Sequence, residues 1–122
     1  MMKLKFGDRA RLRLRLLWTC AILLVIVGSL LPGSSMPMRA LDQLDVSDKL
    51  LHFGAYLVLA FLPALHERWP ALAAALVGAI LLGIALEFAQ RLSPGRSFEI
   101  ADMLADAAGV LCGFVIALPL RS

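Results

Sequence analysis

The chain has 122 residues, of which 61% are hydrophobic and 17% charged, and its mean hydropathy is +0.84. A soluble domain of this size leaves much of its surface exposed and could not hide so much apolar area. The composition therefore excludes an ordinary soluble domain and favours a single membrane domain.

Four apolar stretches of 16 to 19 residues follow one another along the chain: 16–31, 50–65, 71–89 and 100–118. A helix needs about 20 residues to cross the hydrocarbon core, whereas a membrane strand needs about 10 with alternating polarity. The predicted fold class is therefore all-α, an integral membrane bundle of four transmembrane helices. We divide the chain into a basic arm, 1–15, and a four-helix transmembrane domain, 16–122.

The arm before the first span carries six basic residues and one acid, Asp8. The positive-inside rule places the N-terminus in the cytoplasm, and four crossings return the C-terminus to the same side. This orientation puts eight of the twelve Lys and Arg residues inside and seven of the nine acids outside. A basic arm joined to a span favours contact with anionic lipid headgroups over nucleic acid. A cleaved signal peptide is disfavoured, because no A-x-A-like site follows Leu31.

Small residues recur at every fourth position in the last two spans. The two stripes are Ala71, Ala75, Ala79, Gly83 with Glu87, and Ala101, Ala105, Gly109, Gly113, Ala117. Small residues let membrane helices approach closely, so we expect these two spans to pack against each other. Antiparallel packing would bring Glu87 beside the first turns of the fourth span. The two cysteines, Cys20 and Cys112, have no ligand-spaced neighbours and are expected to be inert.

Ionisable residues border the last three spans at the side away from the termini. His52 lies one turn inside the second span, Glu87 ends the third, and Asp106 lies about 9 Å below Ile100. Acids in a first turn, such as Asp48, can simply cap a helix. That explanation fails for the three deeper groups, which are tolerated in a membrane only if they pair or line a wet cavity. We therefore predict an internal polar cluster on the outer side.

The predicted site combines residues from three spans. Its catalytic candidates are His52, Glu87 and Asp102. Its predicted binding residues are Asp48, Lys49, His52, Tyr56, Glu87, Gln90, Arg96, Asp102 and Asp106. We expect no cofactor and no metal, because a single histidine among carboxylates gives a metal site little support.

Three segments resemble the VanZ-like family of small bacterial membrane proteins. They are "DKLLHFGAY" at 48–56, "EFAQRLSPGRSFEIADMLADAAG" at 87–109, and the closing Gly113. The family usually has Asn where this chain has Asp106, and an acid there could pair with His52 or Arg96. The family is named after an accessory protein of glycopeptide resistance, linked to tolerance of teicoplanin. The resemblance implies a multi-pass protein of the bacterial inner (cytoplasmic) membrane.

Three functions are compatible with these residues. The first is a non-enzymatic envelope protein whose polar cluster binds an outer-leaflet lipid headgroup, a glycan or a lipoglycopeptide. The second is an intramembrane hydrolase or transferase, with His52 as general base oriented by Glu87 or Asp102 and with Arg96 stabilising developing charge. The third is a small proton-coupled transporter, which is disfavoured because the polar residues stop in the outer third. The expected partners are membrane lipids but no nucleic acid, and the glycine-rich helices permit a homodimer without requiring one.

Overall fold

The computed structural model describes residues 6–30, 48–90, 92 and 100–121, with only the backbone described for Asp48. Its elements are α1 (Asp8–Leu30), α3 (Asp48–His66), α4 (Trp69–Gln90), α5 (Ile100–Ala117) and a short 3-10 helix, η1 (Leu118–Leu120). Each of the four α-helices is long and apolar enough to cross a membrane. The predicted all-α membrane bundle is thus confirmed.

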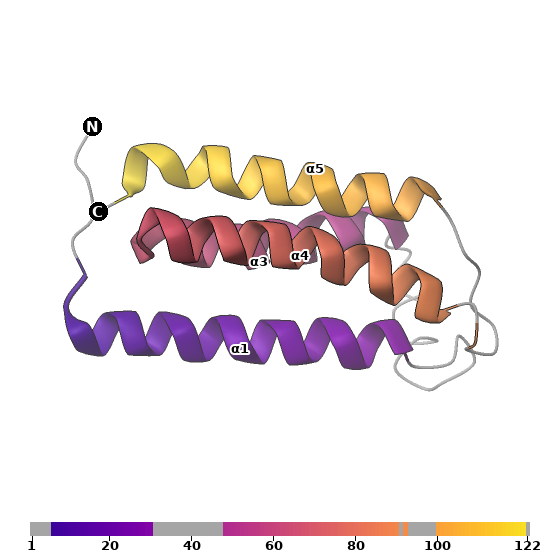
Figure 1. The fold of residues 1–122 in the computed structure, drawn as a ribbon, viewed down its shortest axis with the longest axis horizontal. Helices are drawn as coiled ribbons and strands as arrows, with labels where there is room; N and C mark the ends of the chain where they lie inside the picture. Colours follow the sequence, from indigo (N-terminus) through magenta and orange to yellow (C-terminus); the bar gives the residue numbers. More distant parts are fainter. Residues whose placement is uncertain (1–5, 31–47, 91, 93–99, 122) are drawn as a thin grey trace.

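The four helices run side by side along one axis, and the start of α1 and the end of α5 lie at the same end of the bundle (Figure 1). We call this the terminal end. The start of α3, the end of α4 and the start of α5 lie together at the other end, which we call the loop end. The predicted polar residues on these three segments are therefore brought to one end of the bundle.

Helix α1 begins at Asp8, eight residues before the predicted start of the first span. The arm from 9 to 16 is composed of Arg, Leu and Ala, which all favour helix. An acid in the first turn also interacts favourably with the helix dipole. Part of the basic arm therefore continues the first span as one helix.

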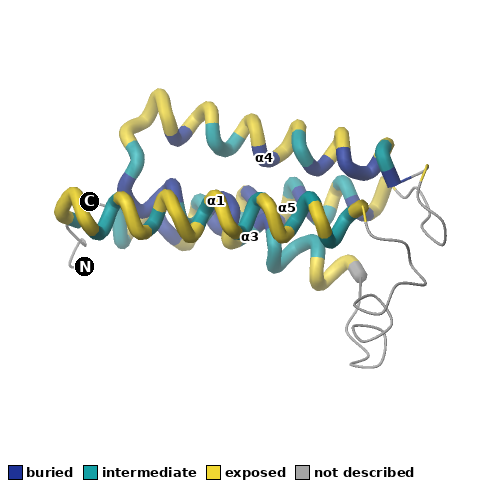
Figure 2. Tube along the Cα trace, turned by 90° about the horizontal axis from the view of Figure 1, so that it is seen from below, coloured by how far each residue is buried: buried dark blue, intermediate teal, exposed yellow. Residues whose placement is uncertain are grey.

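The core lies between α3, α4 and α5, and α1 packs against its outside. Buried residues line the inward sides of the other helices, whereas no residue of α1, which is described throughout, is buried (Figure 2). One core cluster joins Tyr56, Leu59 and Ala60 of α3 to Ala79 and Val110. Helix α1 is attached by its Trp18, whose Nε1 donates a hydrogen bond to the Leu59 carbonyl at 2.8 Å.

The glycines of α5 pack against α3, so the prediction that the α5 stripe faces α4 is wrong for these positions. A Cβ at Gly109 would collide with the Phe53 carbonyl oxygen, and one at Gly113 with the Leu57 carbonyl oxygen. Both α3 and α5 run from the loop end to the terminal end (Figure 1). The pairing is therefore parallel, and the small side chains let the two backbones touch.

Candidate functional site

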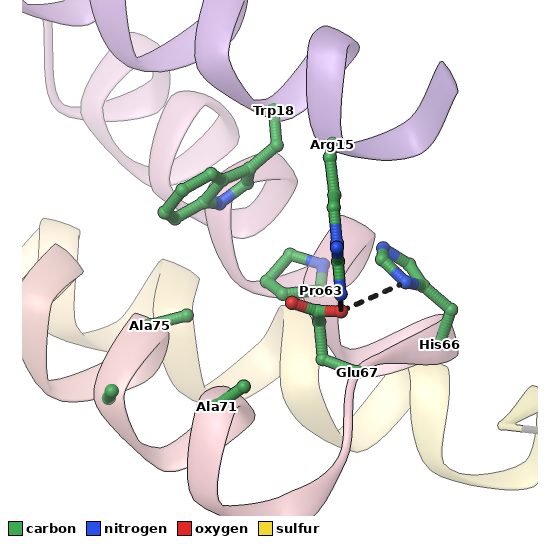
Figure 3. Close-up of a pocket in the computed structure, with 8 residues that line it drawn as sticks. Arg15, Trp18, Pro63, His66, Glu67, Ala71 and Ala75 are labelled. Carbon is green, nitrogen blue, oxygen red and sulfur yellow. Dashed lines mark hydrogen bonds and ion pairs between the residues drawn. The ribbon is translucent and has the colours of Figure 1, made fainter. Parts of the chain in front are cut away.

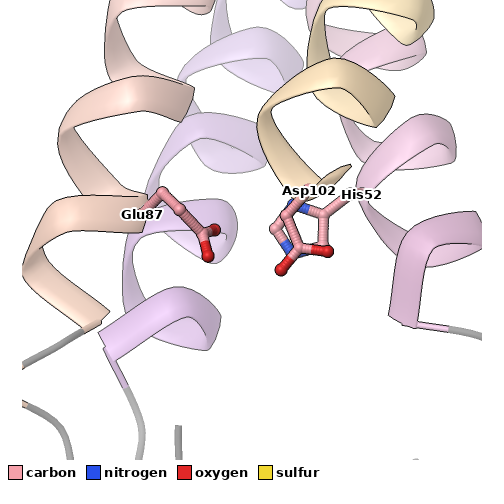
Figure 4. A group of neighbouring side chains, drawn as sticks. All are labelled: His52, Glu87 and Asp102. Carbon is pink, nitrogen blue, oxygen red and sulfur yellow. The ribbon is translucent and has the colours of Figure 1, made fainter. Parts of the chain in front are cut away.

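Four polar groups from three helices meet at the loop end. His52 comes from the first turns of α3, Glu87 from the last turn of α4, and Asp102 and Asp106 from the first two turns of α5. The three acids are only 1%, 3% and 2% exposed, respectively. Figure 4 shows Glu87 directed from α4 toward Asp102 and His52. We call these four residues, together with Lys49, the polar cluster.

Carboxylates lie beside both ring nitrogens of His52, and one of them is within hydrogen-bond distance. Its Nδ1 lies 2.7 Å from Asp106 Oδ1, within hydrogen-bond distance, and its Nε2 lies 3.8 Å from Asp102 Oδ2. When Asp106 is ionised, Nδ1–H donates to it, and the neutral ring then has its lone pair on Nε2. The imidazole is thus fixed in orientation with Nε2 toward Asp102.

A glycine on α4 makes the position of Asp106 possible. A Cβ at residue 83 would lie 2.7 Å from Asp106 Oδ2, so any other residue at Gly83 would crowd the carboxylate. Close contact between α4 and α5 at this level therefore depends on Gly83. Of the two partners that the sequence left open for Asp106, His52 and Arg96, the structure shows His52 in contact with it, and it also brings Glu87 to the start of α5.

Lys49 supplies positive charge at the rim of the polar cluster. Its Nζ lies 3.5 Å from Asp102 Oδ1, and its side chain is 48% exposed whereas that of Asp102 is 4% exposed. A pair with one solvated partner contributes little to stability, so Lys49 mainly lowers the local negative potential. Within the described part of the polar cluster, three carboxylates therefore face one lysine and one histidine.

Two other predicted residues lie beside the polar cluster. Tyr56, one turn deeper than His52, is 2% exposed, and the charged groups that act on its hydroxyl are Asp106 and Glu87. Gln90 is also buried, and its Nε2 donates a 3.0 Å hydrogen bond to the Ser29 carbonyl of α1. Gln90 thus connects α4 to α1, whereas Tyr56 forms the floor below the polar cluster.

Two predicted site residues cannot be placed with the others. Arg96 lies outside the described residues, and the side chain of Asp48 lies outside them as well. The structure therefore brings together His52, Glu87, Asp102 and Asp106, with Lys49 at the rim and Tyr56 below.

The sequence profile of the VanZ/LLP1 family matches residues 16–121, nearly the whole chain. The chain belongs to the VanZ/LLP1 family. No curated protein and no solved structure matches it. The polar cluster of this VanZ/LLP1 protein lies entirely within the matched region, whereas the arginines at 9, 11, 13 and 15 precede it.

Three side chains of the VanZ/LLP1 polar cluster could share one divalent ion. Ligand atoms of His52, Glu87 and Asp102 all lie within 4.8 Å of one another. One imidazole nitrogen and two carboxylate oxygens suit borderline metals such as Zn²⁺, Mn²⁺ or Fe²⁺. Asp106, bonded to the other nitrogen of His52, would then orient the imidazole as a supporting partner. The same geometry also suits a general base, with Asp106 in the orienting role that the sequence predicted for Glu87 or Asp102.

Sequence reasoning missed a second set of interacting polar residues in this VanZ/LLP1 protein, which lies at the terminal end. Arg15 Nη2 lies 2.8 Å from Glu67 Oε1, and His66 Nδ1 lies 3.3 Å from the same oxygen. Arg121 donates to the backbone carbonyls of Ala64, at 2.7 Å, and of Glu67. The available signal was Glu67 itself, one of only two acids that share the predicted cytoplasmic side with eight basic residues.

Proposed function

We propose that this VanZ/LLP1 protein lies in the bacterial inner membrane with its polar cluster on the outer side, where it binds the headgroup of a glycan-bearing lipid without chemical turnover. The observation that carries the proposal is the fixed arrangement of His52, Asp102, Asp106 and Glu87, contributed by three helices at one end of an apolar bundle. Charged groups in membrane spans are expensive and mark ligand or ion sites by default.

The chemistry of the polar cluster favours hydroxyl and amino groups of a ligand. Carboxylates accept hydrogen bonds, and among the described residues three of them gather around the His52 imidazole, with Lys49 beside Asp102. Sugar hydroxyls and amino sugars supply the matching donors. Lys49, at the exposed rim, is placed to contact the phosphate that joins such a headgroup to its lipid.

The 2.7 Å contact between His52 and Asp106 favours hydrolysis or group transfer as a second candidate function. In that case Nε2 of His52 would take a proton from an attacking water or hydroxyl, and Asp106 would stabilise the imidazolium that forms. The proton would pass on to the leaving oxygen of a lipid ester or phosphate. This alternative shares the site with the binding proposal but forms products.

The proposed orientation is testable by cysteine labelling. In a Cys20→Ala, Cys112→Ala background, Leu92→Cys at the loop end should react with a membrane-impermeant maleimide in intact spheroplasts. Leu92 is 89% exposed, so access should be limited only by the membrane. Arg68→Cys, which is exposed between α3 and α4 at the terminal end, should react only after permeabilisation. The reverse pattern would place the polar cluster in the cytoplasm and overturn the proposal.

Ligand binding is tested by native mass spectrometry of the purified protein with two probes. One is a polyprenyl-diphosphate-linked disaccharide and the other is the polyprenyl phosphate without sugar. We expect selective retention of the sugar-bearing lipid. We also expect His52→Gln to lower the retention of the sugar-bearing lipid about tenfold or more, because the glutamine amide cannot reproduce the hydrogen bond that the imidazole makes.

The matched control for the binding test is Leu104→Ala. Leu104 lies on α5 between the two aspartates but is 66% exposed, so its truncation should leave retention unchanged. Equal retention of both probes would contradict recognition of the sugar. Accumulation of a cleaved or transferred product would overturn the non-enzymatic proposal in favour of the second candidate.

A further inference from the structure

A cavity near the terminal end lies far from the polar cluster. Its volume is about 310 Å³, within the range of small-ligand pockets of about 300–1,000 Å³. Figure 3 shows it between α1, α3 and α4. The lining residues are Arg15, Trp18, Pro63, His66, Glu67, Ala71, Ala74 and Ala75.

The walls of the cavity are mostly apolar and short. Trp18 forms one side, and its ring is fixed by the hydrogen bond from Nε1 to the Leu59 carbonyl. Ala71 and Ala75 of α4 face it across the cavity, with methyl groups too short to fill the space (Figure 3). Because Ala71 and Ala74 are exposed, the cavity reaches the surface of the bundle, where a membrane helix meets lipid.

The polar mouth of the cavity is pre-organised by an ion pair. Arg15 donates to Glu67 Oε1 from both Nε, at 3.2 Å, and Nη2, at 2.8 Å. A guanidinium has five N–H donors, so further donors of Arg15 can reach another acceptor while Glu67 fixes its position. The Arg15 side chain is 60% exposed, which leaves these donors accessible at the mouth.

The surroundings of the mouth are strongly positive. Among the described residues of the terminal end, six arginines, at 9, 11, 13, 15, 68 and 121, stand against two acids, Asp8 and Glu67, an excess of four positive charges. Arg11, Arg15 and Arg121 are close enough for their charges to act on the His66 imidazole. Arg11 lies one turn before Arg15, on the same face of α1. This charge excess favours an anion.

We propose that this cavity seats one anionic phospholipid, with its phosphate on Arg15 beside Arg11 and an acyl chain along Trp18, Pro63 and the alanines of α4. The lipid belongs to the leaflet at the terminal end. Its phosphate complements the arginine excess, and its chain fills an apolar slot that opens toward lipid. The site is independent of the polar cluster and of the ligand proposed there.

The test is native mass spectrometry of the full chain released from nanodiscs of equal parts phosphatidylglycerol and phosphatidylcholine. The wild type should retain phosphatidylglycerol, and Ala75→Leu should release it because a larger side chain fills the slot. Ala73→Leu, on the same helix but outside the cavity, should retain it. If Ala75→Leu lowers the thermal stability of the protein, Ala74→Leu, at an exposed position of the same wall, replaces it.

A second set of variants tests the phosphate contact. Arg15→Gln should lower retention of phosphatidylglycerol about tenfold or more, whereas Arg13→Gln should not. Glu67→Gln removes the negative charge but keeps an amide oxygen that can accept from Arg15 and hold the guanidinium in place, so it should retain the lipid at least as well as the wild type. Release by this variant would show a structural effect only and overturn the contact. Equal retention of both lipids would overturn the charge argument. Release of a lipid-free dimer would overturn the proposal, because a second copy of the chain would then occupy the cavity.

Discussion

Gly109→Leu is expected to force α3 and α5 apart and so to destabilise the whole bundle. Its Cβ would overlap the Phe53 carbonyl oxygen, which belongs to the backbone of α3 and cannot rotate away as a side chain could. The two helices can relieve this overlap only by separating along their parallel contact. We expect a loss of about 3 kcal/mol or more in the free energy of unfolding, at the upper end of overpacking costs.

The effect of Gly109→Leu is measured by denaturation with SDS in mixed micelles, in which the fluorescence of Trp18 and Trp69 reports unfolding. Gly78→Leu is the matched control, because no atom lies within 4 Å of a Cβ built there and the residue is exposed on α4. The control should unfold at the same SDS fraction as the wild type. If both variants unfold together with the wild type, the close parallel packing of α3 and α5 is not what stabilises the bundle.

The second large effect is expected when the pair of His52 and Asp106 is broken. Both side chains are largely removed from solvent and lie 2.7 Å apart, so removing one leaves the other buried without its partner in this pair. His52→Ala and Asp106→Ala should each cost about 3 kcal/mol of unfolding free energy. The double variant should cost clearly less than the sum, with a coupling energy of about 2 kcal/mol.

Two further variants show whether the coupling belongs to this hydrogen bond. Asp106→Asn keeps an oxygen that can accept from Nδ1–H of His52, so it should cost much less than Asp106→Ala. Lys49→Ala removes the half-exposed rim charge and should cost about 1 kcal/mol or less. Additive losses in the double variant would mean that His52 and Asp106 stabilise the fold separately.

Much of the candidate site could be predicted because membrane spans constrain the ends of helices. A span about 20 residues long must run from one side to the other, so the start of α3, the end of α4 and the start of α5 had to meet at one end. The depth of His52 and Asp106 within their spans also predicted that they would turn inward. The approach of Glu87 to Asp102 followed from antiparallel packing of the third and fourth spans.

The partners of individual side chains could not be predicted in the same way. Periodicity places Gly109 and Gly113 on one face of α5, but it does not say toward which neighbour that face is rotated. The rotation is fixed by the total packing of the helices, and it placed the glycines on α3. The same rotation placed Asp106, rather than Glu87, within hydrogen-bond distance of His52 Nδ1. Gly83 leaves room for the Asp106 carboxylate because it has no Cβ.

The sequence by itself determined that this protein has four helices able to cross a membrane and that its deep polar residues share one end. Apolar length and chain direction are one-dimensional properties, so they can be read along the chain. Only the tertiary structure decided the parallel contact of α3 with α5, the bonding of His52, and the cavity mouth formed by Arg15 and Glu67. Those features depend on how helices distant in sequence are rotated and spaced, which is set by the sum of many contacts.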